Sequence, residues 1–192
     1  KYGCTITNLT SLGFSAMMHG YMAFDKEGTL LVPFRTWRNT ITGEASEELT
    51  ALFHYHIPQR FSIAHLYQAM LKKEPHLTKI DSLLTLAGYI NWQMTGEKVI
   101  GIGEASGMFP IDIQTKDYNQ NMINQFEEKA ASMGYNFHLR ELLPKTALAG
   151  EIAGYLTEEG ARKLDVSGSL KAGVPIAPAE GDAGTGMTAT NS

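Results

Sequence analysis

Short apolar runs alternate with segments of helical periodicity along most of this chain, and this alternation is what most constrains its fold. Apolar runs typical of β-strands occupy five segments: 12–17, 21–24, 29–34, 82–86 and 174–179. Apolar residues recur with helical spacing in five others: 43–56, 62–75, 87–96, 119–134 and 157–164. Chains that interleave the two patterns fold as α/β or mixed α+β domains. The 192 residues are enough for one ordinary domain with a core of its own.

Local signals predict several boundaries of these elements. The apolar runs on either side of the polar turn 25–28 predict a β-hairpin, with Pro33 near a strand end. Ser62 is expected to cap the helix that begins there, and Pro75 to stop it. Thr157 is expected to cap the short helix that follows it.

Composition disfavours several classes of partner. The net charge is −4 with no basic patch, which argues against a nucleic-acid partner. No apolar run approaches the roughly 20 residues of a membrane span. Cys4 is the single cysteine, so no intrachain disulfide or cysteine zinc site is expected, and a cytoplasmic location is the simplest interpretation. The chain opens on Lys1 and ends just after a glycine-rich run, so we expect a piece of a longer protein.

The segment "EGDAGTG" places a carboxylate inside a glycine turn that follows an apolar run. Gly181, Gly184 and Gly186 flank Asp182 and permit close approach of a ligand to the backbone. A helix that starts here would present free N–H groups to an anion such as phosphate. Asp182 could then accept the proton of a hydroxyl that attacks a phosphoryl group. The alternative is that Asp182 only forms the turn or caps the helix.

Weaker candidates lie elsewhere in the sequence. His19, between an apolar strand and a glycine, could point into a cleft or be a satisfied structural residue. Trp37 could stack on a sugar or merely anchor its loop. The small-residue segment 103–107 could admit a ligand or a helix, or be an ordinary loop. His54 and His56 do not share a helical face and are interpreted as surface or packing residues.

Taken in order, five segments resemble the FGGY carbohydrate kinases, in particular the xylulokinase-like branch. They are "SAMMHGYMAFDKEGTLLVPFRTW" (15–37), "LTLAGYINWQMTGE" (84–97), "EASGMFPID" (104–112), "LPKTALAGEIAGYLT" (143–157) and "GVPIAPAEGDAGTGM" (173–187). Their order and spacing fit the family over nearly the whole chain.

The resemblance implies a fold and a domain organisation. The fold would be a ribonuclease H-like α/β domain of the actin/hexokinase/Hsp70 superfamily, a mixed sheet with flanking helices. Residues 1–192 would be most of the N-terminal, sugar-binding domain, without its first phosphate-binding segment. The C-terminal ATPase domain would be absent, so this chain alone is expected to be inactive.

The resemblance also implies an activity: ATP-dependent phosphorylation, with Mg²⁺, of a small sugar, in particular a ketose such as xylulose or ribulose. Asp182 matches the family's catalytic base, Met18 and His19 match its sugar-contacting pair, and Trp37 matches its loop tryptophan. The expected partners are a small sugar and ATP, with no nucleic acid and no membrane. A homodimer is an assembly that the resemblance permits.

Two departures from the family pattern leave alternatives open. Ala183 stands where many members carry Asn, and Arg38, Asn39 and Thr40 replace the usual Asn-Asp pattern after the tryptophan. These changes favour a second hypothesis, a non-catalytic sugar-binding or assembly module of the same fold. A third hypothesis is an ATPase of the superfamily that acts on protein.

Overall fold

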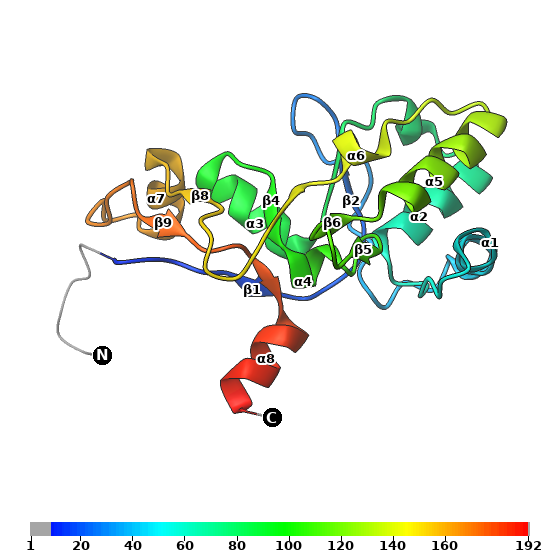
Figure 1. Cartoon of the computed structure of the whole chain (residues 1–192). Helices are drawn as coiled ribbons and strands as arrows, with labels where there is room; N and C mark the ends of the chain where they lie inside the picture. The colour runs from blue at the N-terminus through cyan, green and yellow to red at the C-terminus, as the bar shows by residue number, and fades with distance from the viewer. Residues whose placement is uncertain (1–8, 192) are drawn as a thin grey trace.

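The computed structural model describes residues 9–191, so Cys4 lies outside the described residues. Helices and strands alternate along the chain, as expected (Figure 1). The helices are α1 (Gly43–Phe53), α2 (Ser62–Leu71), the 3-10 helix η1 (Pro75–Thr78), α3 (Leu86–Thr95), α4 (Ile102–Ala105), α5 (Gln120–Ser132), α6 (Leu139–Leu142), α7 (Glu158–Leu164) and α8 (Asp182–Thr190). The strands are β1 (Ser15–Ala16), β2 (Met22–Phe24), β3 (Ser82–Leu84), β4 (Val99–Gly101), β5 (Ile111–Asp112), β6 (Asp117–Tyr118), β7 (Lys145–Ala147), β8 (Gly154–Tyr155), β9 (Pro175–Ile176) and β10 (Glu180–Gly181).

The strands form two-stranded pairs of both orientations. β1 pairs with β10 and β4 with β7 in parallel, whereas β2–β3, β5–β6 and β8–β9 are antiparallel. A hydrogen bond of 2.8 Å from the Gly101 N–H to the Ala179 carbonyl links the two parallel pairs. The mixed character of the predicted sheet is therefore confirmed, and the ends of β4 and β10 lie side by side.

The predicted hairpin around the turn 25–28 forms only in part. Two isolated antiparallel bridges, Phe24–Leu30 and Tyr21–Arg35, join the two sides of the turn, but the regular ladder of β2 is with β3. The segment after the turn includes Pro33, which has no N–H to donate, and it does not continue as a strand. The buried run 82–84, expected as a covered strand, pairs with β2 as β3, while the segment after the turn bonds to β2 through Tyr21 and Ala23.

Several helix signals were predicted correctly. The Thr157 side chain accepts a hydrogen bond of 3.0 Å from the Gly160 N–H, as a helix cap does. Gly96 ends α3 in the left-handed conformation that glycine adopts without strain. Ile123 and Phe126 are buried on one face of α5.

The predicted cap and stop of α2 were wrong. Phe61 occupies the cap position, and Ser62 is the first helical residue. The Ser62 hydroxyl donates 2.6 Å to the Gly20 carbonyl instead of capping its own helix. The helix ends at Leu71, and Pro75 opens the 3-10 helix η1.

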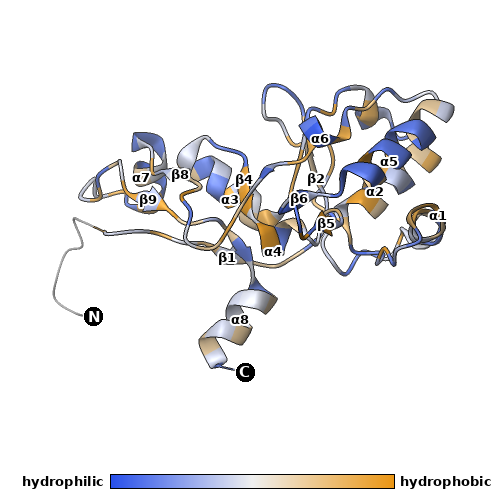
Figure 2. Cartoon of the chain, in the orientation of Figure 1, coloured by the Kyte–Doolittle hydropathy of each residue, from blue (hydrophilic) through white to orange (hydrophobic). Residues whose placement is uncertain are grey.

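Most of the hydrophobic core lies around α1, α2 and α5. Its largest fully buried side chains include Tyr21, Tyr67, Phe109 and Phe126. Figure 2 shows α2 largely in hydrophobic colours, whereas α8 is pale and stands away from the rest of the chain. None of the α8 residues is buried. Within residues 9–191, no helix combines the length and the apolar character needed to cross a membrane.

Candidate functional site

Asp182 lies where the parallel pair of β1 and β10 gives way to α8. β10 ends at Gly181, and Asp182 is the first residue of the helix. Its Oδ1 accepts a hydrogen bond of 3.2 Å from the Met18 N–H, 164 residues away in sequence, and one of 3.1 Å from the Ala183 N–H. The side chain is exposed. The structure therefore brings Asp182 and the Met18–His19 pair together at one edge of the sheet.

Gly181 differs from the two glycines that follow it. A Cβ at Gly181 would collide with the Met18 side chain and come within 2.7 Å of Glu104 Oε2. A Cβ at Gly184 or Gly186 would meet nothing within 4 Å. Gly181 is thus required for packing inside the chain, whereas Gly184 and Gly186 leave open space on α8 that a ligand could approach.

His19 and Gly20 turn the chain sharply between β1 and β2. Both have a left-handed backbone, with φ of 67° and 92°. At Gly20 a Cβ would lie 2.6 Å from the Arg35 carbonyl oxygen, so no larger residue fits. A non-glycine residue in this conformation costs about 1 kcal/mol or more, a kind of strain that is common at functional sites. The interruption of the apolar run after β1 is therefore a tight turn that presents His19.

The His19 ring is held from three sides. It stacks on the Phe61 ring, with centroids 5.5 Å apart and planes 20° apart. Its Nδ1 lies 3.2 Å from the Gly107 carbonyl oxygen, and Arg60 Nε donates 3.0 Å to its Nε2. Burial is the main cause that lowers the pKa of His19; the Gly107 carbonyl opposes this effect and the Arg60 charge adds to it.

Sequence reasoning missed Arg60 and Phe61. Arg60 and Phe61 lie just before α2, with Phe61 in its cap position, and nothing in their spacing relates them to His19. For the segment 103–107 the sequence allows the approach of a ligand or a helix, or an ordinary loop; its first three residues belong to α4. Here it lets a side chain approach, because a Cβ at Gly107 would lie 2.6 Å from His19 Nδ1.

Trp37 is 46% exposed, and the Arg38 guanidinium carbon lies 5.1 Å from its ring centre. An antiparallel bridge joins Tyr21 to Arg35. Because the two segments run in opposite directions, the chain leads from Arg35 to Trp37 on the side of the bridge where His19 precedes Tyr21. The aromatic ring that contacts His19 is nevertheless Phe61.

The expected surface character of His54 and His56 agrees with their exposure.

Glu104 is a second carboxyl group beside Asp182 that the sequence did not single out. It is 0% exposed, and neither of its oxygens has hydrogen-bond geometry with a described residue. The Glu180 carboxylate accepts 2.9 Å from the Glu104 backbone N–H. Burial raises the pKa of Glu104 to about 7; the Thr85 hydroxyl opposes the rise, and the carboxylates of Glu180 and Asp182 add to it. Near neutral pH a large fraction of Glu104 is therefore the uncharged acid.

Of the two expected ligands, Mg²⁺ and ATP, the described residues offer a place for a phosphate of ATP but no metal site. Among residues 9–191, no group of three His, Cys, Asp or Glu side chains is arranged to hold a metal ion. The residues described here do not fit a dedicated Mg²⁺ site, and no chemical step is assigned to one. For a nucleotide phosphate, the open space at Gly184 and Gly186 in the first turns of α8 fits an approaching anion.

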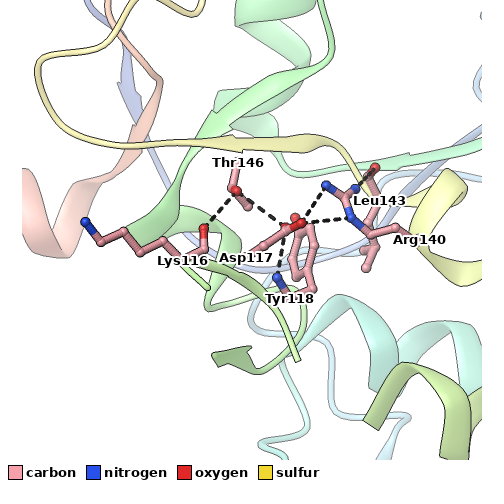
Figure 3. Close-up of polar contacts among 6 residues, drawn as sticks. All are labelled: Lys116, Asp117, Tyr118, Arg140, Leu143 and Thr146. Atoms are coloured by element: carbon pink, nitrogen blue, oxygen red, sulfur yellow. Dashed lines mark hydrogen bonds and ion pairs between the residues drawn. The ribbon is translucent and has the colours of Figure 1, made fainter. Parts of the chain in front are cut away.

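A cavity of about 550 Å³ lies away from Asp182, between α6 and the ends of β3 and β4. Its lining includes Ser82, Lys98 and Leu143. Next to it, Arg140 pairs with Asp117 at 3.1 Å and contacts the Leu143 carbonyl, and Thr146 donates to Asp117 (Figure 3). These contacts join β6, α6 and β7. We interpret them as structural, because none of the predicted site residues lies among them.

Comparisons with known proteins agree with the resemblance found in the sequence. Residues 1–188 match the N-terminal domain of the FGGY family of carbohydrate kinases. L-fuculokinase of Escherichia coli K12 is 28% identical over 167 residues, which cover 82% of this chain and 32% of that protein. Xylulose kinase of the same strain is 24% identical over 203 residues, covering 97% of this chain and 38% of that protein. The chain thus spans about a third of the length of the curated relatives it matches.

Solved structures agree on the fold. A ligand-bound xylulose kinase of Lactobacillus acidophilus has a TM-score of 0.76 at 16% identity, covering 97% of this chain and 37% of that one. A xylulose kinase of Rhodospirillum rubrum has a TM-score of 0.73 at 19% identity, covering 92% and 36%. The predicted mixed α/β fold is confirmed as the fold of these sugar kinases. The chain belongs to the FGGY family of carbohydrate kinases and matches the N-terminal domain of that family.

Proposed function

We propose that the protein containing this chain transfers the γ-phosphoryl group of ATP to a hydroxyl of a small sugar, with Asp182 as the general base. The observation that supports this most is the hydrogen bond of 3.2 Å between the Met18 N–H and Asp182 Oδ1. It places an exposed carboxylate beside the residues that match the family's sugar contacts. A general base must lie within reach of the proton that it removes. A sugar bound against Met18 and His19 would bring a hydroxyl close to Asp182.

In the proposed reaction, the sugar hydroxyl oxygen forms a bond to the γ-phosphorus and the bond to the β–γ bridging oxygen breaks. Asp182 takes the hydroxyl proton, and ADP is released. The two N–H groups on Asp182 Oδ1 fix the direction of the carboxylate. Positioning and electrostatic stabilisation supply most of the acceleration in such reactions. Met18, His19 and Trp37 would line the sugar site, while Gly184 and Gly186 would face the nucleotide.

The substrate that we propose is a ketose of the xylulose or ribulose type. The names of the similar proteins, xylulose kinase and L-fuculokinase, support a keto sugar. The proposal also includes a cytoplasmic location, which is inferred from composition, and Mg²⁺-bound ATP, which is inferred from the family. A homodimer stays a prediction.

The variant Asp182→Asn in the intact protein tests the base. Loss of a general base lowers turnover by about 10²–10⁴-fold. We expect that loss in kcat, with an unchanged thermal unfolding curve, because the side chain is exposed. Glu128→Gln on the exposed face of α5 is the matched carboxylate-to-amide control. Turnover of Asp182→Asn within threefold of the parent would contradict the assignment.

A second candidate is the non-catalytic sugar-binding or assembly module. It is favoured by Ala183, an exposed residue next to Asp182 that offers no polar group to a sugar. Calorimetric titration of the intact protein with ketoses, with and without ATP, separates the two. Heat of binding without any ADP formation supports the module, whereas ADP formation that depends on the sugar supports the kinase.

A further inference from the structure

The side chain of Glu180, on β10, rests against two glycines of the segment that joins β4 to α4. A Cβ at Gly101 would overlap the Glu180 carboxylate, and a Cβ at Gly103 would lie 2.7 Å from Glu180 Oε2. At both glycines the three atoms nearest to such a Cβ all belong to the Glu180 side chain. Neither glycine has the left-handed backbone that would itself require glycine. The two glycines therefore make room for this one side chain.

Hydrogen bonds hold the end of β10 in this position. Glu180 Oε2 accepts a hydrogen bond of 2.9 Å from the Glu104 N–H of α4. The Ala179 carbonyl accepts one of 2.8 Å from the Gly101 N–H, and the Glu180 N–H donates 3.1 Å to the Phe14 carbonyl. The strand that leads to the proposed base is thus bound to α4 by a side chain and to its neighbours on both sides by its backbone.

The position of Asp182 depends on where β10 ends, because α8 buries no residue against the rest of the chain. Asp182 follows Glu180 by two residues, and its Oδ1 bonds to the Met18 N–H at 3.2 Å. A shift of β10 would change that distance and the direction of the carboxylate. The Glu180 carboxylate is half-buried and binds α4, so it holds the strand and does not take the hydroxyl proton.

We propose that Glu180 is a positioning residue for Asp182: its carboxylate, held by α4, fixes the end of β10 from which Asp182 reaches the substrate hydroxyl. This inference rests on the proposed function and adds to it a residue that acts through Asp182. A catalytic group displaced by about 1 Å can slow a reaction about 10²-fold. An interaction that only directs the base should lower kcat and leave the sugar KM nearly unchanged.

Substitutions of Glu180 in the intact protein separate the contact from the charge. Glu180→Ala removes the contact and should lower kcat at least tenfold, with less than a threefold change in sugar KM. Glu180→Gln should stay within threefold of the parent, because its amide oxygen still accepts from the Glu104 N–H and its shape fits the same space. Glu128→Ala on the exposed face of α5 is the matched control and should behave as the parent. Sugar-dependent ADP release gives kcat and KM, and urea unfolding gives the folded fraction.

Two results at Glu180 would overturn the inference. A parent-like kcat in the folded fraction of Glu180→Ala would assign this side chain to stability alone. An equal loss of kcat in Glu180→Gln would show that its charge, and not its contact with α4, is what the reaction needs. Absence of sugar-dependent ADP release from the parent protein contradicts the proposed function itself, so the two failures are distinguishable.

Gly103→Ala tests the same contact from the other side and keeps Glu180 in place. The added methyl group presses on Glu180 Oε2 and should lower kcat at least fivefold, again with little change in sugar KM. In Glu180→Ala the space is vacant, so Gly103→Ala should cause no further loss there. Losses that multiply in the double variant would overturn the inference. If Glu180→Ala does not fold, Gly103→Ala alone decides, and a parent-like kcat overturns the inference.

Discussion

The helical core around α1, α2 and α5 and the junction of β1, β10 and α8 are held together by different interactions. In the core, Leu49, Tyr67 and Phe126 are 0% exposed and pack among other apolar side chains. At the junction, α8 buries no residue, and the contacts include the Met18–Asp182 hydrogen bond and the close approach at Gly181. Burial therefore stabilises the core, whereas specific geometry defines the junction. Substitutions should accordingly divide into those that change stability and those that change chemistry.

The largest effect on stability is expected in the core. Leu49 lies on α1 and is fully buried, so Leu49→Ala removes buried methyl groups and leaves a cavity. Such changes cost about 2–5 kcal/mol of unfolding free energy. Urea unfolding measures the loss, and the KM for sugar should stay unchanged in the folded fraction. Leu164→Ala, at a 45% exposed position on α7, is the control. A loss under 1 kcal/mol at Leu49 would show that the core is not the main source of stability.

Glu104 on α4, beside the junction, is a buried group whose protonation makes stability depend on pH. Glu104 has a pKa of about 7 in the fold against a usual value of 4.5, so the folded state binds the proton more tightly than the unfolded chain does. Stability should therefore fall as pH rises from about 4.5 to 7, by about 3 kcal/mol at most, and then level off. Glu104→Gln should lose this dependence. Thermal unfolding of both forms between pH 5 and 8 measures it, with Glu128→Gln as the control. Parallel pH profiles for Glu104→Gln and the parent would contradict the neutral, buried acid.

Features that depend on neighbouring residues could be predicted from the sequence, whereas features that depend on distant contacts could not. Local signals sufficed where the physics is local: the apolar face of α5, the Thr157 cap of α7 and the helix that follows Gly181. Each depends on residues within a few positions of one another. The glycine turn expected before that helix does not form, because β10 leads directly into α8 and both Gly184 and Gly186 lie within the helix. The family resemblance then identified the residues that meet at the junction, although they are 164 positions apart.

What could not be predicted depends on contacts between distant segments. Arg60 reaches His19 across 41 positions, and no periodicity connects them. Glu104 stands in a glycine-rich stretch whose composition is typical of an exposed loop, but β10 and the chain before α3 cover it. The pairing of β2 with β3, in addition to the segment that follows the turn, likewise joins residues about 60 positions apart and buries the run 82–84.

Alanine substitutions at Gly181 and Gly184, three residues apart, compare a close-packed position of the junction with an open one. Gly181→Ala would press a methyl group against Met18 and within 2.7 Å of Glu104 Oε2, and overpacking of this kind costs about 1–3 kcal/mol. It should also lower kcat/KM, because Met18 holds Asp182 through its backbone. Gly184→Ala adds its methyl group to open space in a helix and should be neutral or stabilising by up to about 1 kcal/mol. Urea unfolding measures both; sugar-dependent ADP release is measured for Gly181→Ala alone, because Gly184 is itself proposed to face the nucleotide. Equal effects of the two substitutions would mean that Gly181 is merely another helix-end glycine and that the junction does not depend on its close contact.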